Sequence, residues 1–180
     1  EIGDKILLSN GEEICYTKRK KRALREELQK KQEFMIAKIS KEKLPLTPEE
    51  YGKYYKICDG LPFAFTDIEM VFNEEKKAVD WIFRYGNEAL ATLEKLPLDK
   101  MIGNSFSSLF SNMDAKWLHV YERATLYGET LEIMDYSPEI DTNLKIICFP
   151  TFPGHCGCIL FNADQMKSIS EENHLVRLAA

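Results

Sequence analysis

The chain has 180 residues, of which 29% are charged and 44% are hydrophobic, and its formal net charge is −5. This composition is typical of a globular protein, and the length suits one domain with an appendage. No apolar run approaches the roughly 18 residues that a membrane-spanning helix needs, so we expect no such helix. The five cysteines are odd in number and scattered, which fits neither a disulfide framework nor a spaced zinc site and indicates reduced thiols in a cytoplasmic protein.

The positive charge is concentrated at the amino-terminal end of the chain. Residues 1–43 contain twelve Lys and Arg against eight Asp and Glu, whereas residues 44–180 contain twelve against twenty-one. Residues 6–12 predict a short strand that leads into an Asn-Gly turn. From Thr17 to Lys38, apolar residues recur on one face, which predicts an amphipathic helix of about five turns. These apolar residues are Leu24, Leu28, Met35 and Ile39.

The predicted helix begins with a basic run, residues 18–22. Positive charge is unfavourable at a helix N-terminus, where the helix dipole favours anions, so the run could contact the phosphates of DNA. On that interpretation residues 1–43 are the end of a winged-helix domain. The alternative is a solvated helix face that packs against the rest of the chain or pairs with a second copy of it.

A second, short helix is predicted to begin after Thr47. Thr47 is a good N-cap residue, Pro48 suits the first helical position, and Glu50 at the third position completes a capping box. We expect this helix to end at Asp59-Gly60 and to cover one face of a sheet.

Two strands, a series of short helical segments, one longer helix at residues 114–127 and three further strands follow in order. The strands are predicted at residues 61–72, 78–85, 129–136, 143–149 and 155–161. The fold class is therefore α+β, with a single antiparallel five-stranded sheet, short helices on one face and flanking helices at the amino terminus.

Three segments between the second strand and the third carry landmarks of a known family. Phe-Arg-Tyr-Gly-Asn-Glu-Ala-Leu at residues 83–90 is a strand, an N-capping Asn and a helix; Met-Ile-Gly-Asn-Ser-Phe at 101–106 is an Ile-Gly-small turn; and residues 117–129 end in Gly-Glu. In this order and spacing they resemble a PAS sensor domain. The resemblance covers about residues 61–166, and is strongest to PAS domains of bacterial proteins that end in a diguanylate cyclase (GGDEF) domain.

The resemblance implies three parts: an N-terminal helical extension (residues 1–58), a PAS domain (59–166) and the start of a C-terminal signalling helix (167–180). It implies a non-enzymatic sensory domain that binds a small ligand or mediates dimerisation and signals to an attached output domain. That output would be a diguanylate cyclase, which makes cyclic di-GMP. One alternative is the effector-sensing domain of a winged-helix transcription regulator, and another is a dimerisation module with a filled core.

No group of residues typical of an enzyme is found, and the GGDEF signature is absent from these residues. Residues 155–158, His-Cys-Gly-Cys, contain soft metal ligands. Alternation along a strand places Cys156 and Cys158 on one face and His155 on the other. Since two converging ligands do not complete a tetrahedral site, we expect small apolar thiols and no metal here.

Cofactors known in PAS relatives are not supported by the matching positions. A flavin photoadduct would need a cysteine just after Gly103, where this chain has Asn104. Haem would need a histidine near Trp117, and His119 lies two residues further on, roughly 200° around the helix. The ligand therefore stays unknown.

The remaining candidates are aromatic, aliphatic and thiol side chains on the predicted inner faces. They would line a cavity for a small, flat or apolar ligand, or they would simply pack together as a core. We expect a homodimer with an attached output domain, and nucleic acid as a partner only under the winged-helix alternative. The pocket candidates are Phe65, Phe83, Tyr85, Leu90, Phe106, Leu109, Trp117, Tyr121, Cys148 and Cys158.

Overall fold

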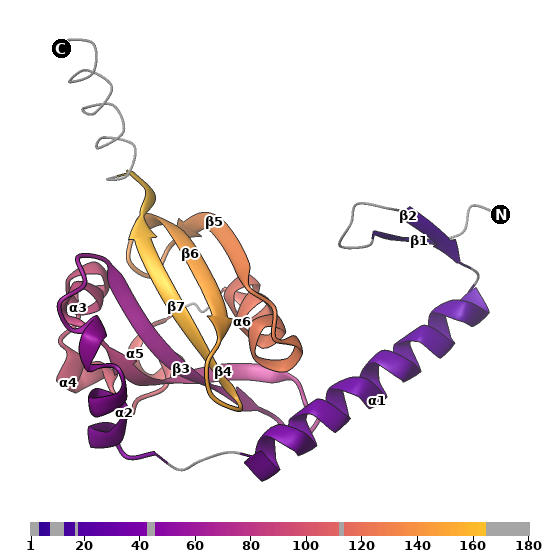
Figure 1. Cartoon of the computed structure of the whole chain (residues 1–180). Helices are drawn as coiled ribbons and strands as arrows, with labels where there is room; N and C mark the ends of the chain where they lie inside the picture. The colour runs from indigo at the N-terminus through magenta and orange to yellow at the C-terminus, as the bar shows by residue number, and fades with distance from the viewer. Residues whose placement is uncertain (1–3, 8–12, 17, 43–45, 112–113, 165–180) are drawn as a thin grey trace, which may run out of the picture.

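The computed structural model describes residues 4–7, 13–16, 18–42, 46–111 and 114–164. Five strands form its central antiparallel sheet: β3 (Ala64–Phe72), β4 (Ala78–Gly86), β5 (Leu131–Ser137), β6 (Thr142–Pro150) and β7 (His155–Asn162). They lie in the order β4-β3-β7-β6-β5, with β4 and β5 at the edges (Figure 1). The predicted α+β class and the five-stranded antiparallel sheet are confirmed. The first strand begins at Ala64, later than predicted, because Pro62 has no N–H to donate to a neighbouring strand.

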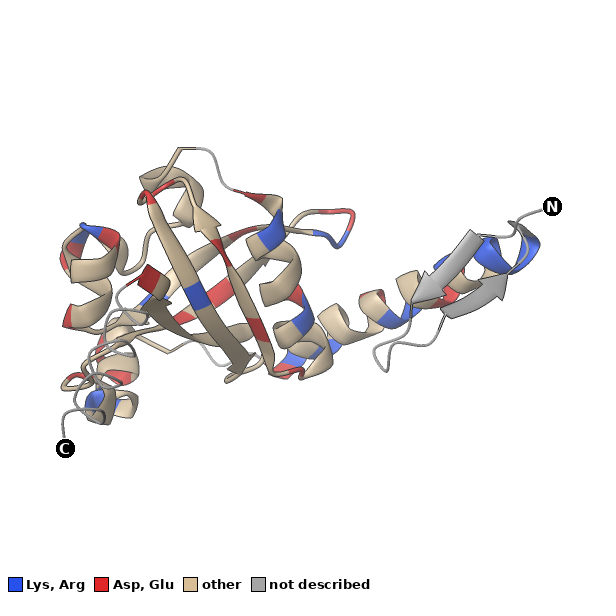
Figure 2. Cartoon of the chain, turned by 90° about the horizontal axis from the view of Figure 1, so that it is seen from above, with Lys and Arg blue, Asp and Glu red and all other residues tan. Residues whose placement is uncertain are grey.

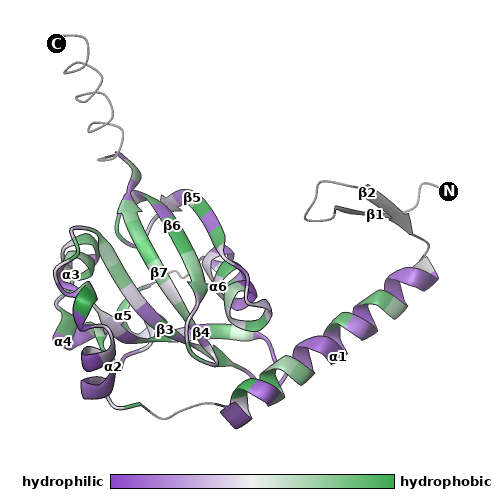
Figure 3. Ribbon diagram, in the orientation of Figure 1, coloured by the Kyte–Doolittle hydropathy of each residue, from purple (hydrophilic) through white to green (hydrophobic). Residues whose placement is uncertain are grey.

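Four helices cover one face of this sheet, which we call the inner face. They are α3 (Glu88–Glu94), α4 (Leu98–Met101), α5 (Phe106–Leu109) and α6 (Ala115–Tyr127). Hydrophobic residues recur along the strands of the sheet (Figure 3). The core between them consists of aliphatic, aromatic and thiol side chains, including Ile68, Trp81, Phe83, Leu90, Met101, Phe106, Trp117, Tyr121, Ile146 and Cys158.

One helix, α2 (Pro48–Tyr54), packs on the opposite, outer face of the sheet. Its predicted capping box is confirmed: the Glu50 backbone N–H donates to the Thr47 hydroxyl at 3.3 Å, and the Thr47 N–H donates to the Glu50 carboxylate at 2.7 Å. The helix ends earlier than expected, and a separate 3₁₀ turn, η1 (Lys56–Cys58), follows it. A second cluster of aromatic residues fills this face: Tyr51, Tyr55, Phe65 and Tyr85.

The amino-terminal part is a long helix with a small strand pair at its far end. Helix α1 (Lys18–Glu42) runs one turn beyond the predicted end and points away from the sheet (Figure 1). Strand β1 (Asp4–Leu7) pairs antiparallel with β2 (Glu13–Tyr16), and the predicted Asn-Gly turn lies outside the described residues. Basic residues gather at the amino-terminal end of α1 (Figure 2). Among the described residues, no helix combines the length and apolar character needed to cross a membrane.

An extra residue in β4, Arg84, changes which face the strand's side chains occupy. Asp67 pairs with Tyr85 while Ile68 pairs with Phe83, so the register skips Arg84. Such a β-bulge interrupts the alternation of side chains between the two faces. Phe83 therefore belongs to the inner core, whereas Tyr85 belongs to the outer cluster.

Asn87, predicted as an N-cap, joins three parts of the chain and is almost fully buried. Its amide oxygen accepts the backbone N–H of Leu90 at 3.1 Å, which caps α3, and that of Phe65 at 3.0 Å. Its amide nitrogen donates to the carbonyl oxygens of Cys58 and Phe63 at 3.1 and 3.0 Å. One side chain therefore fixes the end of η1, the start of β3 and the start of α3.

Replacing Asn87 with aspartate should lower the free energy of unfolding by about 2–4 kcal/mol, although the cap is kept. The carboxylate still accepts two N–H groups, but its second oxygen faces the carbonyls of Cys58 and Phe63 and cannot donate to them. Urea denaturation followed by circular dichroism measures the change. Asn73→Asp is the control, because the exposed Asn73 side chain accepts a hydrogen bond from the Lys77 N–H at 2.9 Å and donates none to any described residue. Equal losses in both variants would contradict the role of Asn87.

Candidate functional site

A small cavity lies between the inner face of the sheet and helices α3, α5 and α6, with a volume of about 30 Å³. This is room for one or two water molecules or for one small polar group. The sequence left open whether these side chains line a cavity or pack as a core. In the structure, large side chains fill most of the space. The residues that line it are Thr66, Ile68, Trp81, Phe83, Glu94, Phe106, Trp117, Tyr121, Ser137, Glu139, Leu144, Ile146, Cys158 and Leu160.

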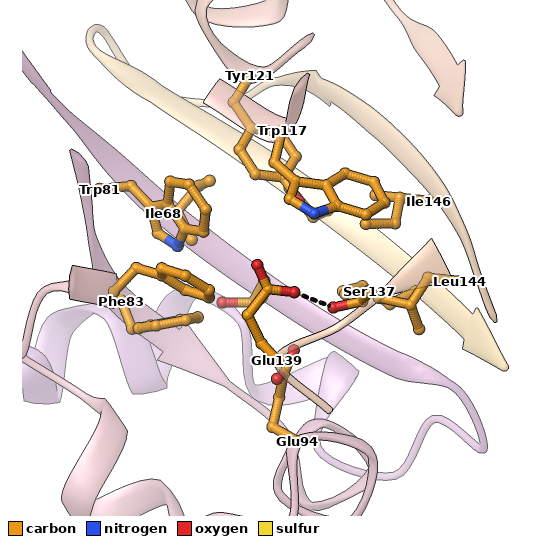
Figure 4. Close-up of a pocket in the computed structure, with 14 residues that line it drawn as sticks. Ile68, Trp81, Phe83, Glu94, Trp117, Tyr121, Ser137, Glu139, Leu144 and Ile146 are labelled. Atoms are coloured by element: carbon orange, nitrogen blue, oxygen red, sulfur yellow. Dashed lines mark hydrogen bonds between the residues drawn. The ribbon is translucent and has the colours of Figure 1, made fainter. Parts of the chain in front are cut away.

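The aromatic wall of the cavity is built from β4, α5 and α6 (Figure 4). The Trp81 ring lies 4.3 Å from the Phe106 ring between centroids, and the Tyr121 ring meets it edge-on at 5.1 Å. Ring pairs of this kind contribute about 0.5–1.5 kcal/mol beyond the burial of their surface. The wall is thus held in place by contacts among its own members.

Two glutamates bring negative charge to this otherwise apolar space. Figure 4 shows the Glu139 carboxyl group between Phe83 and Ser137, with Glu94 beside it. The Ser137 hydroxyl donates to Glu139 Oε2 at 2.6 Å. The other oxygen, Oε1, is buried and has no hydrogen-bond partner within the described residues. A buried acceptor without a donor costs about 1–3 kcal/mol, more when it is charged, so the site favours the arrival of a donor.

The two carboxyl groups also influence each other. Burial, and in addition the negative charge of Glu139, raises the pKa of Glu94 to about 7. Glu94 is therefore a mixture of protonated and ionised forms at neutral pH. No Lys, Arg or His is among the described residues that line the cavity, so no positive side chain there balances this charge.

The predicted pocket candidates fall into three groups. Phe83, Phe106, Trp117, Tyr121 and Cys158 line the cavity. Leu90, Leu109 and Cys148 pack in the same core without lining the cavity. Phe65 and Tyr85 lie on the outer face, because Phe65 alternates with the inward Thr66 and the bulge at Arg84 turns Tyr85 away from Phe83.

Sequence reasoning missed the residues that give the cavity its charge. Glu94 lies four positions after Leu90 on α3, so helical spacing places it on the buried side of that helix, and this signal was available. Glu139 lies in the turn between β5 and β6, where no periodicity indicates a direction. Trp81 was recognised as part of a strand, but alternation with Phe83 also places it on the inner face.

The thiols and histidines lie as strand and helix geometry predicts. Cys156 and Cys158 pack in the inner core and His155 lies on the opposite side, in contact with outer-face groups. Burial raises the pKa of the Cys158 thiol, so it stays protonated and packs as a small apolar group.

At the position where a haem ligand would be needed, Trp117 is buried, while His119 is exposed. Within the described part of the chain, no three His, Cys, Asp or Glu residues converge as a metal would require.

The outer face holds a second polar cluster, which we call the Asp67 network. Asp67 and His155 are fully buried, and Oδ1 of Asp67 lies 2.6 Å from Nδ1 of His155. The hydroxyl groups of Tyr55 and Thr151 both donate to Asp67 Oδ2, at 2.7 and 2.5 Å. The Tyr51 hydroxyl lies 3.3 Å from His155 Nε2. Two side chains of the α2 segment are thus tied to groups on β3 and β7.

This network is the polar part of the contact between α2 and the sheet. Burial, followed by the charge of Asp67, raises the pKa of Tyr51 to about 12 and that of Tyr55 further. Both phenols therefore keep their protons at neutral pH and remain hydrogen-bond donors. Beside them, Arg84 Nε donates to Glu69 at 2.6 Å. The position of α2 depends on these specific bonds as well as on ring packing.

The sheet thus separates an inner cavity that holds two carboxyl groups from an outer network that holds a helix. The first has the room and the unpaired acceptor to bind a small group, and the second links the flanking segment to the sheet. No protein-family model matches the chain, and a search of curated proteins finds no match.

Proposed function

We propose that this chain is a sensory domain of the PAS type. It binds a small ligand in the inner cavity or mediates dimerisation, and it passes the change to an attached output domain. By resemblance to bacterial GGDEF proteins, that output is a diguanylate cyclase that makes cyclic di-GMP. The domain itself is regulatory rather than catalytic.

The observation that carries this proposal is the enclosure of an aromatic cavity by short helices on one face of a five-stranded antiparallel sheet. The order of elements, two strands, short helices, a longer helix and three strands, is also that of PAS domains. The buried Glu139 oxygen without a partner adds to it, because a purely structural core gains nothing from such a group.

A path from the cavity to the end of the domain runs along β7. Cys158 and Leu160 of this strand line the cavity, and the strand ends two residues later at Asn162. Because β7 is hydrogen-bonded to β3 on one side and β6 on the other, a ligand that shifts the cavity wall also shifts the frame of the sheet. An output domain attached after β7 would sense this change as a shift between two states. The predicted signalling helix itself lies outside the described residues.

Dimerisation would use α1. Leu24 and Leu28 are 41% and 52% exposed, and they continue the stripe whose other members, Met35 and Ile39, are half-buried near the sheet. Pairing of two copies through the same stripe would cover these leucines. Light scattering at high micromolar concentration should give the mass of a dimer, and a monomer would contradict this part of the proposal.

The winged-helix alternative is favoured by one observation, the antiparallel pair β1–β2 directly before a basic helix. A strand pair next to positive charge suits contact with a phosphate backbone. On this reading the inner cavity is the effector site of a transcription regulator.

The coding sequence on either side of residues 1–180 tests both candidate functions, the sensory domain of a diguanylate cyclase and the effector domain of a transcription regulator. A diguanylate cyclase output requires a Gly-Gly-Asp/Glu-Glu-Phe motif within roughly 100 residues after Ala180, given the usual size of a domain. The full-length protein should then convert GTP to cyclic di-GMP. A recognition helix encoded before Glu1 would favour the transcription regulator, and a stop codon soon after Ala180 would remove the cyclase proposal.

A further inference from the structure

We infer that the inner cavity binds the ammonium group of a small organic amine, held by Glu94 and Glu139 and faced by the aromatic wall. This inference rests on the proposed sensory function and specifies the chemical class of the signal. It follows from three properties of the cavity: its charge, its walls and its size.

The charge of the cavity calls for a positive partner with hydrogen-bond donors. The unpaired Oε1 of Glu139 is an acceptor, and the Glu94 carboxyl group lines the same cavity, where burial raises its pKa to about 7. Two carboxylates that line the same mainly apolar space repel each other, and each loses part of the solvation it had in water. An ammonium group would donate to both and neutralise the repulsion. A neutral ligand would leave it in place, and an anion would increase it.

The walls favour an organic cation over a metal ion. Trp81, Phe83 and Trp117 present ring surfaces to the cavity, and a cation near the face of an aromatic ring is stabilised by about 0.5–2 kcal/mol. Hard metal ions instead favour several carboxylate ligands, and within the described residues no three His, Cys, Asp or Glu side chains converge as a metal would require. The combination of rings and carboxylates suits an alkylated nitrogen.

The size of the cavity limits what can enter without rearrangement. A volume of about 30 Å³ accepts an ammonium or methylammonium group and excludes a flat ring system such as flavin or haem. The ligand is therefore a small primary or methylated amine, or a longer amine that places only its nitrogen between the two carboxyl groups.

Isothermal titration with methylammonium chloride tests the inference. Potassium chloride is the control for ionic strength, and methanol is the control for a neutral molecule of similar shape. Saturable binding of methylammonium alone is expected. Glu139→Gln and Glu94→Gln should weaken it at least about tenfold, whereas Glu88→Gln, an exposed glutamate on the same helix as Glu94, should leave it unchanged. Phe83→Leu keeps an apolar wall but removes a ring, so it provides a second weakened variant if the glutamine variants unfold.

Proton release on binding provides a second measurement, and binding at the protein surface would not change it. Because Glu94 is partly protonated at pH 6.5, capture of a cation there should expel a proton, and the measured heat should depend on the ionisation enthalpy of the buffer. At pH 8.5 this dependence should disappear.

Two outcomes would overturn the inference: no saturable heat with methylammonium, or equal binding of potassium. Native mass spectrometry of the protein purified from cells separates these failures from failure of the proposed function. A bound neutral or anionic molecule would preserve a sensory cavity and reject an amine. A full-length protein without any output domain would reject the sensory function even if methylammonium binds.

Discussion

Replacing Asp67 with alanine should lower the free energy of unfolding by about 3–5 kcal/mol, because it removes the shared acceptor of a buried hydrogen-bond network and leaves several polar groups without a partner. The change leaves His155 and the hydroxyl groups of Tyr55 and Thr151 without their common acceptor in the interior. Urea denaturation measures the loss. Because two bonds of the network reach into the α2 segment, backbone amides of residues 51–55 should also exchange with solvent faster, even where the sheet is still folded.

Adjacent tyrosines provide a milder pair of variants. Tyr55→Phe removes the bond to Asp67 and should cost about 1–3 kcal/mol, whereas Tyr54 is 65% exposed and Tyr54→Phe should change stability by less than about 0.5 kcal/mol. If Tyr55→Phe proved as neutral as Tyr54→Phe, the Asp67 network would not be what holds α2, and ring packing alone would have to do so.

Glu94→Gln should stabilise the protein at pH 8 and remove part of its pH dependence. Burial, with the charge of Glu139, raises the pKa of Glu94 in the folded state from 4.5 to about 7. The folded state therefore binds more protons than the unfolded state between these values. The favourable contribution is fully present below pH 4.5 and is lost as the pH rises through 7. At pH 8 the ionised group costs about 3 kcal/mol, and glutamine avoids this cost.

The comparison of variants isolates this single group from all others that titrate. Thermal or urea unfolding of the wild type and Glu94→Gln at pH 5, 6, 7 and 8 should give curves that diverge as the pH rises. Glu88→Gln, on the exposed side of α3, should follow the wild type throughout. Parallel curves for wild type and Glu94→Gln would show that Glu94 is not enclosed in the cavity.

Local chemistry accounts for the parts of the fold that the sequence predicts well. The capping box at Thr47 and the N-cap at Asn87 act between neighbouring residues, so both are readable without the structure. The strands were predicted from alternation and differ by up to three residues at their ends. The end of α2 was predicted less well, because Tyr55 leaves the helix to pack on Phe65 and Tyr85, which are distant in sequence.

Some residues of the candidate site can likewise be predicted from the sequence, and others cannot. Trp117 and Tyr121 are separated by one helical turn and both reach the cavity, as helical spacing predicts. Tyr85 does not reach it, since one extra residue in β4 is invisible in a pattern of alternating aromatic residues. Phe65 does not reach it either, because alternation along β3 turns its neighbour Thr66 inward instead. Glu139 could not have been placed at all, because the path of its turn depends on how β5 and β6 pack against the helices.

The bulge at Arg84 makes the pairing of this strand, rather than its number of residues, the feature that separates the two faces. If Arg84 were deleted, Phe83 and Tyr85 would become neighbours, and ordinary alternation would still place Phe83 inward and Tyr85 outward, opposite Ile68 and Asp67. If the strand instead kept Arg84 and paired in regular register, Tyr85 would face inward and bring a phenol ring into a core with only about 30 Å³ to spare. The outer cluster would lose the same ring. A relative that lacks a residue at position 84 can therefore keep both faces, whereas one that keeps the residue must also keep the irregular pairing.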